Sequence, residues 1–295
     1  MYKAVFYNLY IMKKFLIISS ISLAIYIVLS PLRGYASFGI SGLVGFLFFF
    51  ILTIFFEKKY REQKSPLFIS GSVLLGMSLI PAPIHIIQWE LALVSLPEYL
   101  IHLSGVVFAY LFIIIRKKIR FVIPTLGLLL TLYMFFWGYD YWVHYLSYDS
   151  FTGNISFSQK PEIQGKDENG VVITKKDFEN KIVLFDFWHT ACGECFKEMP
   201  EVQKLYDKYK KNDNFKLYLC NIPIKTDTAG KAPAMIKKFG FSMPVLMLSL
   251  EESNRILEKF KFNGVPTILI IDKNQEVIFK GSAKNAENVL ENLLK

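Results

Sequence analysis

Apolar residues are concentrated before residue 140 of this 295-residue chain, and they restrict what that half can form. A helix needs about 20 apolar residues to cross the hydrocarbon core of a bilayer. Five stretches approach or reach that length: residues 15–29, 38–56, 67–87, 99–115 and 121–137. The first is short, and the third contains Pro81 and Pro83. We therefore predict an α-helical membrane domain of about five transmembrane helices over residues 1–140.

Lysine and arginine residues between these stretches predict the orientation of the chain, because cytoplasmic loops carry an excess of them. Eleven lie on one side of the predicted membrane, and Arg33 alone lies on the other. The eleven are Lys3, Lys13, Lys14, Lys58, Lys59, Arg61, Lys64, Arg116, Lys117, Lys118 and Arg120. This bias predicts a cytoplasmic N-terminus and, after five crossings of the cytoplasmic membrane, a C-terminal domain outside the cytoplasm.

A second interpretation of the first apolar stretch is a cleaved signal peptide. Lys13 and Lys14 precede it, and Gly34-Tyr35-Ala36 offers a cleavage site. Four transmembrane helices would then remain, and the C-terminal domain would still lie outside the cytoplasm.

The net charge of +9 comes mainly from the predicted membrane domain. Residues 1–140 carry twelve basic and five acidic residues, whereas the remainder of the chain carries 22 and 20. Because the charge follows the topology rather than a basic face, nucleic-acid binding is excluded.

The chain after the last apolar stretch is predicted to leave the membrane and to connect two domains. Tyrosine and tryptophan prefer the headgroup layer, and the sequence holds Trp137, Tyr139, Tyr141, Trp142, Tyr145 and Tyr148 here. Residues 141–159 are therefore assigned to an interfacial segment and a short tether, with the tether at 150–158.

Strand and helix patterns alternate over residues 160–295, which is typical of an α/β domain with helices on both faces of a sheet. Strands are predicted at 171–173, 182–187, 215–220, 245–248, 267–271 and 276–280. Helices are predicted at 194–211, 232–239 and 252–261, with a closing helix from about residue 284.

Cys192-Gly193-Glu194-Cys195 lies at a predicted strand-to-helix junction and can close and reopen a small disulfide ring. Such a dithiol exchanges electrons with other thiols and disulfides. Half of a zinc site has the same spacing, but zinc needs two further ligands. The only other cysteine is Cys220, in an apolar strand where a buried inert thiol is expected.

The region resembles the thioredoxin superfamily, and within it the membrane-anchored reductases of the TlpA/ResA type. Asp186-Phe187-Trp188 precedes the cysteine pair, Pro200 follows it, and Gly264-Val265-Pro266-Thr267 is similar to the cis-proline loop of the family. The resemblance covers residues 160–295. Ala191 stands where a tryptophan is common, and the ring contains Gly-Glu rather than a proline, so the redox potential is left open.

The cysteines and Asp186 are the predicted catalytic residues. Cys192 begins the helix, where free N–H groups stabilise a thiolate, and it is assigned as the nucleophile. Cys195, one turn further, would resolve the mixed disulfide. The resemblance implies a proton-relay role for Asp186 toward Cys195, and burial should raise its pKa. The alternatives are a structural disulfide and an Asp186 that pairs with a basic side chain.

The resemblance also implies the substrate-binding residues. A cis peptide bond before Pro266 would place Val265 and Pro266 beside the disulfide, where the loop backbone pairs with the substrate chain. A trans proline at the entry of a strand is the alternative. Trp188 is expected to pack under this site.

Two side chains are predicted to tune the cysteines. The negative charge of Glu194 disfavours the Cys192 thiolate and should make the protein reducing. His189 either tunes the thiol or faces solvent. We expect no metal and no cofactor other than the redox-active disulfide.

These features predict a membrane-tethered, extracytoplasmic disulfide reductase. Its substrates would be extracytoplasmic protein thiols and disulfides, and a membrane or extracytoplasmic donor would reduce it again. A peroxiredoxin is excluded because its P-x-x-x-T-x-x-C pattern is missing. A copper chaperone using Cys192, Cys195 and His189 stays open, as does a transporter or sensor with an accessory redox domain.

Overall fold

The computed structural model describes residues 2–62, 65–115, 118–157 and 160–294. They form two compact units whose boundary falls between Trp142 and Val143. Lys64, Arg116 and Lys117, which contribute to the predicted orientation, lie outside the described residues. Ser158 of the predicted tether and the following Gln159 also lie outside them. The two stretches of chain are called the first and the second unit.

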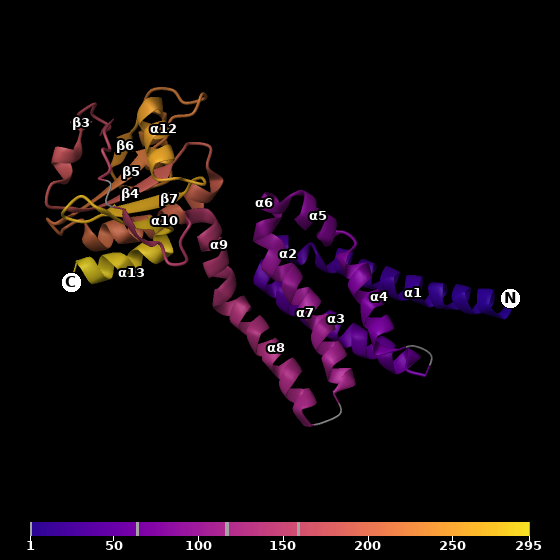
Figure 1. The fold of residues 1–295 in the computed structure, drawn as a ribbon. Coiled ribbons are helices and arrows are strands. Elements are labelled where there is room, and N and C mark those ends of the chain that lie inside the picture. The colour runs from indigo at the N-terminus through magenta and orange to yellow at the C-terminus, as the bar shows by residue number, and fades with distance from the viewer. Residues whose placement is uncertain (1, 63–64, 116–117, 158–159, 295) are drawn as a thin grey trace. The chain divides into compact units, whose positions relative to one another are not determined.

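The first unit is built from helices, as the sequence predicts (Figure 1). They are α1 (Tyr2–Leu29), α2 (Leu32–Tyr35), α3 (Phe38–Tyr60), α4 (Pro66–Ser78), α5 (Pro81–Ile87), α6 (Trp89–Ala92), η1 (Leu93–Ser95), α7 (Leu96–Ile114), η2 (Lys118–Phe121), α8 (Val122–Tyr133), the π-helical turn η3 (Met134–Gly138) and α9 (Tyr139–Tyr148). The last of these, α9, continues into the second unit.

Four helical stretches of the described residues are long and apolar enough to cross a membrane, and a bent pair brings the number to as many as five. The four are Leu9–Tyr35, Phe38–Tyr60, Trp89–Ile114 and Ile119–Tyr148. The bent pair joins α4 to α5 at an angle of 57°. Pro81 and Pro83 explain the break, because proline lacks an N–H group and clashes with the preceding turn.

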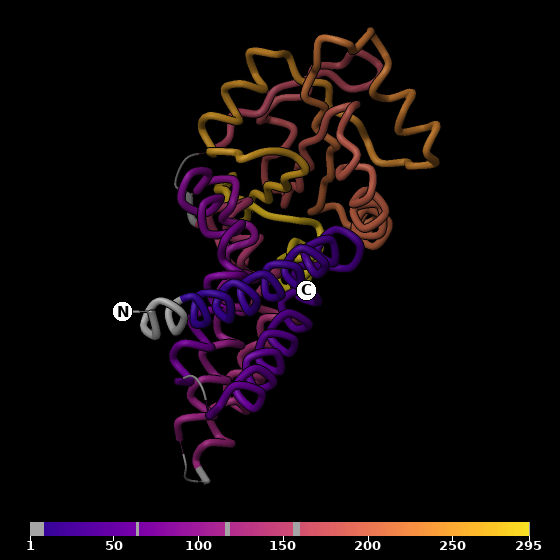
Figure 2. The backbone as a smooth tube through the Cα atoms, turned by 90° about the vertical axis from the view of Figure 1, so that its right-hand side faces the viewer, coloured from indigo at the N-terminus to yellow at the C-terminus, as the bar shows by residue number. Residues whose placement is uncertain are grey.

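Small residues let neighbouring helices of the first unit approach closely, as in other membrane helix pairs. A Cβ atom at Gly105 of α7 would lie 2.6 Å from the carbonyl oxygen of Phe46 in α3. Any larger residue at this position would therefore push the two helices apart. Figure 2 shows the same helices as a backbone tube, from indigo to magenta.

An ion pair between a partly exposed arginine and a buried glutamate also links helices of the first unit. Nε of Arg33 in α2 lies 3.6 Å from the Glu98 carboxylate in α7. The Ser41 hydroxyl of α3 donates a hydrogen bond to the same carboxylate. The pairing offsets part of the cost of burying the Glu98 charge, so the cluster has a structural explanation.

The second unit contains one mixed eight-stranded sheet of order β1-β8-β7-β4-β5-β6-β2-β3. Its strands are β1 (Asn154–Phe157), β2 (Gly165–Lys166), β3 (Val172–Ile173), β4 (Ile182–Trp188), β5 (Phe215–Asn221), β6 (Val245–Met247), β7 (Thr267–Ile271) and β8 (Val277–Gly281). β4, β5 and β6 are parallel, whereas β7 and β8 are antiparallel to their neighbours. β4 is therefore central, and all of its residues are buried.

Helices cover both faces of this sheet, as predicted for an α/β domain. Successive residues of a strand point to opposite faces, and β4 sends Leu184 and Trp188 toward one core but Phe185 and Phe187 toward the other. The first core packs against α10 (Gly193–Tyr209), α11 (Lys231–Lys238) and α13 (Ala283–Leu293). The second packs against η4 (Lys175–Phe178) and α12 (Leu250–Lys259). Figure 1 shows α12 on the opposite side of the sheet from α10 and α13.

Two short strands were not predicted from the sequence. Residues 154–157, assigned to the tether, form β1 and pair with β8. Ile155 packs against the core beside α12. β2 has two residues and contains Gly165. Both strands are too short to show an alternating pattern, so their partners rather than their own sequence identify them.

Candidate active site

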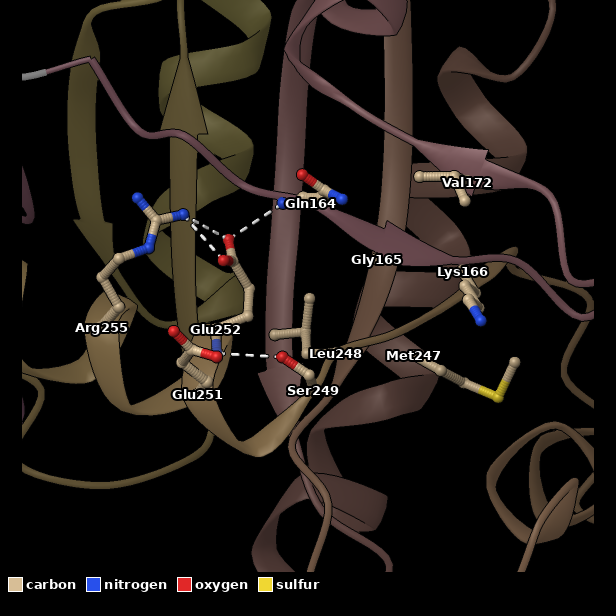
Figure 3. Close-up of a pocket in the computed structure, with 10 residues that line it drawn as sticks. All are labelled: Gln164, Gly165, Lys166, Val172, Met247, Leu248, Ser249, Glu251, Glu252 and Arg255. Carbon is tan, nitrogen blue, oxygen red and sulfur yellow. Dashed lines mark hydrogen bonds and ion pairs between the residues drawn. The ribbon is translucent and has the colours of Figure 1, made fainter.

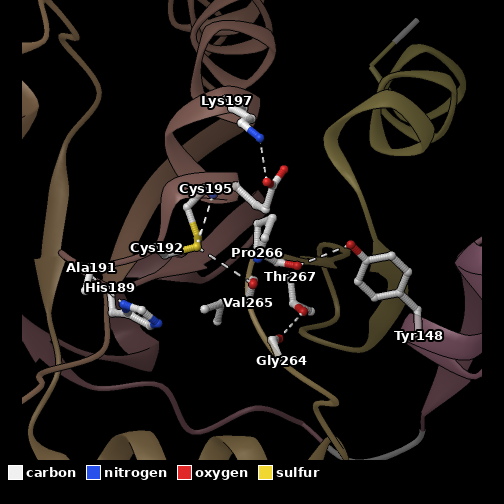
Figure 4. Close-up of a disulfide and its surroundings, with 11 residues drawn as sticks. Tyr148, His189, Ala191, Cys192, Cys195, Lys197, Gly264, Val265, Pro266 and Thr267 are labelled. Carbon is white, nitrogen blue, oxygen red and sulfur yellow. Dashed lines mark hydrogen bonds and ion pairs between the residues drawn. A yellow bond between two sulfur atoms is a disulfide. The ribbon is translucent and has the colours of Figure 1, made fainter. Parts of the chain in front are cut away.

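The cysteine pair lies where the central strand β4 turns into α10, and the structure holds it as a disulfide (Figure 4). Cys192 is the N-cap of α10, and the backbone N–H of Cys195 donates to its sulfur at 3.1 Å. Cys192 is 8% exposed and Cys195 is 2% exposed. Cys192 is thus the more exposed of the two cysteines, and its sulfur is the one that the helix N-terminus contacts.

The peptide bond between Val265 and Pro266 is cis, which confirms the predicted geometry. The carbonyl oxygen of Val265 lies 3.8 Å from the sulfur of Cys192. The Thr267 hydroxyl donates to the carbonyl of Gly264 at 2.7 Å and closes the turn. The structure therefore brings the cis-proline loop beside the disulfide, as the sequence predicted (Figure 4).

Asp186 is the one acidic residue in the buried strand β4. The alternation of the strand turns its carboxyl toward the face that α10 covers. Its Oδ1 atom has no hydrogen-bond partner within the described part of the chain. Burial raises the pKa of Asp186 well above the usual range, and the negative charge of Glu198 adds to the increase. The carboxyl therefore keeps its proton to a higher pH than an exposed aspartate does.

Glu198 is a site residue that the sequence reasoning missed. It lies three residues after Cys195 on α10. The backbone N–H of Ala283 donates to its Oε1 atom, whereas Oε2 has no partner among the residues that the structure describes. Burial raises the pKa of Glu198 despite this hydrogen bond. Its position one helical turn from Cys195 was the signal available in the sequence.

Trp188 is fully buried under the disulfide loop. Its ring meets the ring of Phe196 edge-on, with centroids 5.6 Å apart. This side chain packs beneath the loop as predicted, and its role in substrate binding stays a prediction. Cys220 is also buried, and burial raises the pKa of its thiol, which fits the predicted inert thiol.

The two predicted tuning residues lie at the edge of the site. His189 accepts a hydrogen bond at Nδ1 from the backbone N–H of Ala191, at 3.2 Å. Glu194 is exposed and forms an ion pair with Lys197 at 2.6 Å. This lysine offsets part of the charge of Glu194, which the sequence reasoning did not consider.

A second group of residues, which the sequence reasoning also missed, forms hydrogen bonds with the active-site loop. The buried Thr190 hydroxyl donates to the Asp227 carboxylate. The Lys231 ammonium donates to the same carboxylate at 3.0 Å. Although burial acts to raise it, these hydrogen bonds hold the pKa of Asp227 below its usual value. Asp227 lies 35 positions after Cys192 in the printed sequence, so no local pattern links the two.

An open pocket elsewhere in the second unit has fewer features of a functional site than the disulfide region. This pocket of about 570 Å³ contains none of the predicted site residues, and its Arg255 is paired with Glu252 at 2.7 Å (Figure 3). It is lined by Gln164, Gly165, Lys166, Val172, Met247, Leu248, Ser249, Glu251, Glu252 and Arg255. Among the described residues, no three His, Cys, Asp or Glu side chains are grouped to hold a metal ion.

The same half of the chain is similar to known proteins. Residues 158–280 match a model described as the AhpC/TSA family. The thiol-disulfide oxidoreductase ResA of Bacillus cereus is 31% identical over 153 residues, which make up 49% of this chain and 84% of that protein. ResA of Geobacillus kaustophilus is 27% identical over 166 residues, 55% of this chain and 87% of that protein. The thioredoxin domain of a thiol-disulfide oxidoreductase from Bacteroides vulgatus aligns with a TM-score of 0.43 and 25% identity, over 48% of this chain and 99% of that domain.

Proposed function

The chain belongs to the family of ResA-type thiol-disulfide oxidoreductases, and from this premise we propose that it is a disulfide reductase tethered to a membrane. The predicted resemblance, the thioredoxin-like domain and the oxidoreductase activity are thereby confirmed. The reductive direction, the location and the residue roles belong to the proposal.

The observation that supports the proposal most directly is the disulfide between Cys192 and Cys195 at the start of α10. A helix N-terminus stabilises a thiolate there, and the N–H of Cys195 already contacts the sulfur of Cys192. The neighbouring cis-proline loop presents backbone that a substrate chain can pair with.

In the proposed reaction, the Cys192 thiolate attacks one sulfur of a substrate disulfide. A mixed disulfide forms, and the other substrate sulfur leaves as a thiolate that takes up a proton. Cys195 then loses its proton and attacks the sulfur of Cys192. The bond to the substrate breaks, the second substrate thiol is released, and the ring closes. Two electrons pass to the substrate, and a dithiol donor returns them by the reverse exchange.

Asp186 is proposed to accept the proton of Cys195 during the second attack. Its raised pKa suits this role, because a base works best when its pKa lies near the working pH. Glu198 adds to that increase in pKa and so acts through Asp186.

The proposed location is outside the cytoplasm, with the first unit in the cytoplasmic membrane. The bias of basic residues supports this orientation, and disulfides form and persist outside the cytoplasm. The membrane half contains no cysteine, so a separate donor must supply the electrons. Substrates would be protein thiols and disulfides on the same side.

A trapping experiment tests the proposal in the full chain. A Cys195→Ser variant cannot resolve, so it should accumulate extracytoplasmic proteins as mixed disulfides through Cys192. The matched Cys192→Ser variant should trap none. In intact cells, an impermeant thiol reagent should label the reduced Cys192 of the wild type. Trapping only by the Cys192→Ser variant would reverse the roles, and labelling only after lysis would contradict the location.

Two measurements on the wild-type protein distinguish the proposed reductase from the alternative, a copper chaperone. Soft thiolates bind Cu(I), so a chaperone should bind Cu(I) tightly in its reduced form and fail to reduce insulin disulfides. The proposed reductase should reduce insulin at the expense of a dithiol donor.

A further inference from the structure

The end of α9 lies against the cis-proline loop inside the second unit. The hydroxyl of Tyr148, the last residue of α9, donates a hydrogen bond to the carbonyl of Pro266 at 3.2 Å (Figure 4). The Asn263 amide donates to the carbonyl of Leu146 at 3.0 Å. Two hydrogen bonds in opposite directions therefore fasten the loop to one turn of α9.

His144 fixes the ring of Tyr148. The centroids of the two rings are 4.6 Å apart, and Nδ1 of His144 donates to the carbonyl of Ser150. His144 is 7% exposed. It fits here because β8 has a glycine at position 281, where a Cβ atom would lie 2.7 Å from the imidazole Nε2. The position of the hydroxyl is thus set by packing rather than by a free side chain.

Lys280 holds the start of the same loop. This buried lysine donates to the carbonyls of Phe260 and Lys261, at 3.3 and 3.2 Å. Its ammonium also lies 3.4 Å from the carboxylate of Asp149, the residue after Tyr148. The segment 144–149 therefore contacts the loop directly at its cis-proline end and through Lys280 at its beginning.

The Tyr148 hydroxyl acts on the part of the loop that faces the disulfide. The Pro266 carbonyl follows the cis peptide bond directly, and the Val265 carbonyl before it lies 3.8 Å from the sulfur of Cys192. Orienting one of these two peptide groups restricts the other, because each is nearly planar. A loop already held in its binding conformation loses less conformational entropy when a partner binds.

We propose that Tyr148 is a positioning residue that adapts the site to extended polypeptide disulfides, by holding the cis-proline backbone ready to pair with a substrate chain. This inference rests on the proposed reductase function and adds a residue that prepares the substrate-binding loop for protein substrates. Small disulfides that have no peptide backbone would not use the prepared loop, so the Tyr148 hydroxyl would matter little for them.

The test uses the full chain in lipid nanodiscs and a Tyr148→Phe variant, which removes one oxygen atom and keeps the ring. With a disulfide-containing peptide as substrate, kcat/KM should fall about threefold to tenfold, the range expected for one lost hydrogen bond, mainly through KM. With hydroxyethyl disulfide it should change less than about twofold. Tyr141→Phe, on the same helix with a ring that is 44% exposed, is the matched control and should behave as the wild type. Equal losses for both substrates, or no loss for either, would overturn the inference.

Hydrogen exchange gives a second measurement that does not depend on activity. Amides of residues 262–265 and of Thr267 should exchange about threefold to tenfold faster in Tyr148→Phe, while amides of the distant strand β5 keep their rates. Unchanged exchange in the loop would overturn the positioning role. If the wild type reduced no peptide disulfide while the exchange rates changed as expected, the proposed function would fail and the claim about substrate class with it, but the loop contact would stand.

Discussion

The negative charge of Glu198, on α10, raises the pKa of Asp186 in the central strand, where burial is the larger cause of the same shift. Each of these carboxyls has one oxygen without a hydrogen-bond partner among the described residues. Protonation of Glu198 would remove its negative charge and so ease ionisation of Asp186. This fits the proposed role of Asp186 as the acceptor of the Cys195 proton.

Asp186→Asn should slow resolution of the mixed disulfide, because asparagine cannot accept the proton of Cys195. General-base catalysis contributes about 100-fold or more, so a loss of about that size is expected near neutral pH. The measurement is the rate at which a chromophoric thiol leaves a mixed disulfide preformed on Cys192.

The first attack by Cys192 should change by less than about threefold in the same variant, because the helix N-terminus rather than Asp186 supports that thiolate. Asp207→Asn, an exposed change on α10, serves as the matched control. An Asp186→Asn variant with full resolution rates at every pH would remove Asp186 from the mechanism.

The same carboxyl should make the second unit less stable as the pH rises. A folded-state pKa above the unfolded value means that the folded protein binds the proton more tightly. This contribution to the free energy of unfolding is present below the usual aspartate pKa and is lost as the pH rises through the raised folded-state value. Asp186→Asn removes it, so the variant should gain stability relative to the wild type as the pH rises, by at most about 1.4 kcal/mol per pH unit.

Cys220 provides the readout for that comparison. It is buried, and in the oxidised protein it is the one cysteine outside the disulfide. The fraction of Cys220 labelled in a short maleimide pulse at each urea concentration therefore reports unfolding of the second unit. Parallel stability curves for the wild type and Asp186→Asn between pH 4 and pH 9 would contradict the assignment.

The sequence was sufficient where the information is local. Local patterns were enough to predict the apolar strand at 182–187, the cysteine pair and the alternation of strands and helices. The resemblance to the family predicted the cis bond before Pro266. The membrane half was predicted for the same reason, since the length and apolarity of a segment decide whether it can span a bilayer. Pro81 and Pro83 marked the third apolar stretch as irregular, but the angle between α4 and α5 could not be predicted from them.

The parts that the sequence did not reveal depend on contacts between distant residues. Tyr148 meets Pro266 across 118 positions, and Thr190 meets Asp227 across 37. β1 is recognisable through its pairing with β8. A tyrosine after an apolar stretch looks like an interfacial anchor, and only the folded loop shows that its hydroxyl has a specific partner.

Thr190→Val should destabilise the second unit by about 1–2 kcal/mol, because it removes one hydrogen bond to the charged Asp227 carboxylate, for which the Lys231 ammonium remains a donor. The effect should shrink in acid. The folded-state pKa of Asp227 is lowered, so its contribution to stability is present above the usual aspartate pKa and is lost as the pH falls through the lowered value. Pulse labelling of Cys220 in urea at pH 7 and pH 3 measures the loss of stability and its pH dependence.

The exposed Thr228→Val change on the same loop is the control. An equal loss of stability at both pH values would show that Thr190 does not act through the charged Asp227.

Glu194 and Lys197 should shift the reduction potential in opposite directions. The carboxylate disfavours the Cys192 thiolate and so favours the disulfide, while Lys197, 2.6 Å away, offsets it. Both side chains are exposed, and an exposed charge of this kind is worth about 1 kcal/mol or less, or about 20 mV for a two-electron couple. Glu194→Gln should therefore raise the potential by up to about 20 mV, and Lys197→Gln should lower it by a similar amount. Equilibration of the full chain with glutathione buffers measures both. The difference between the variants should nearly vanish at about 1 M salt, where the Debye length falls to about 3 Å, and shifts of the same sign in the two variants would show that the charge of this pair does not set the potential.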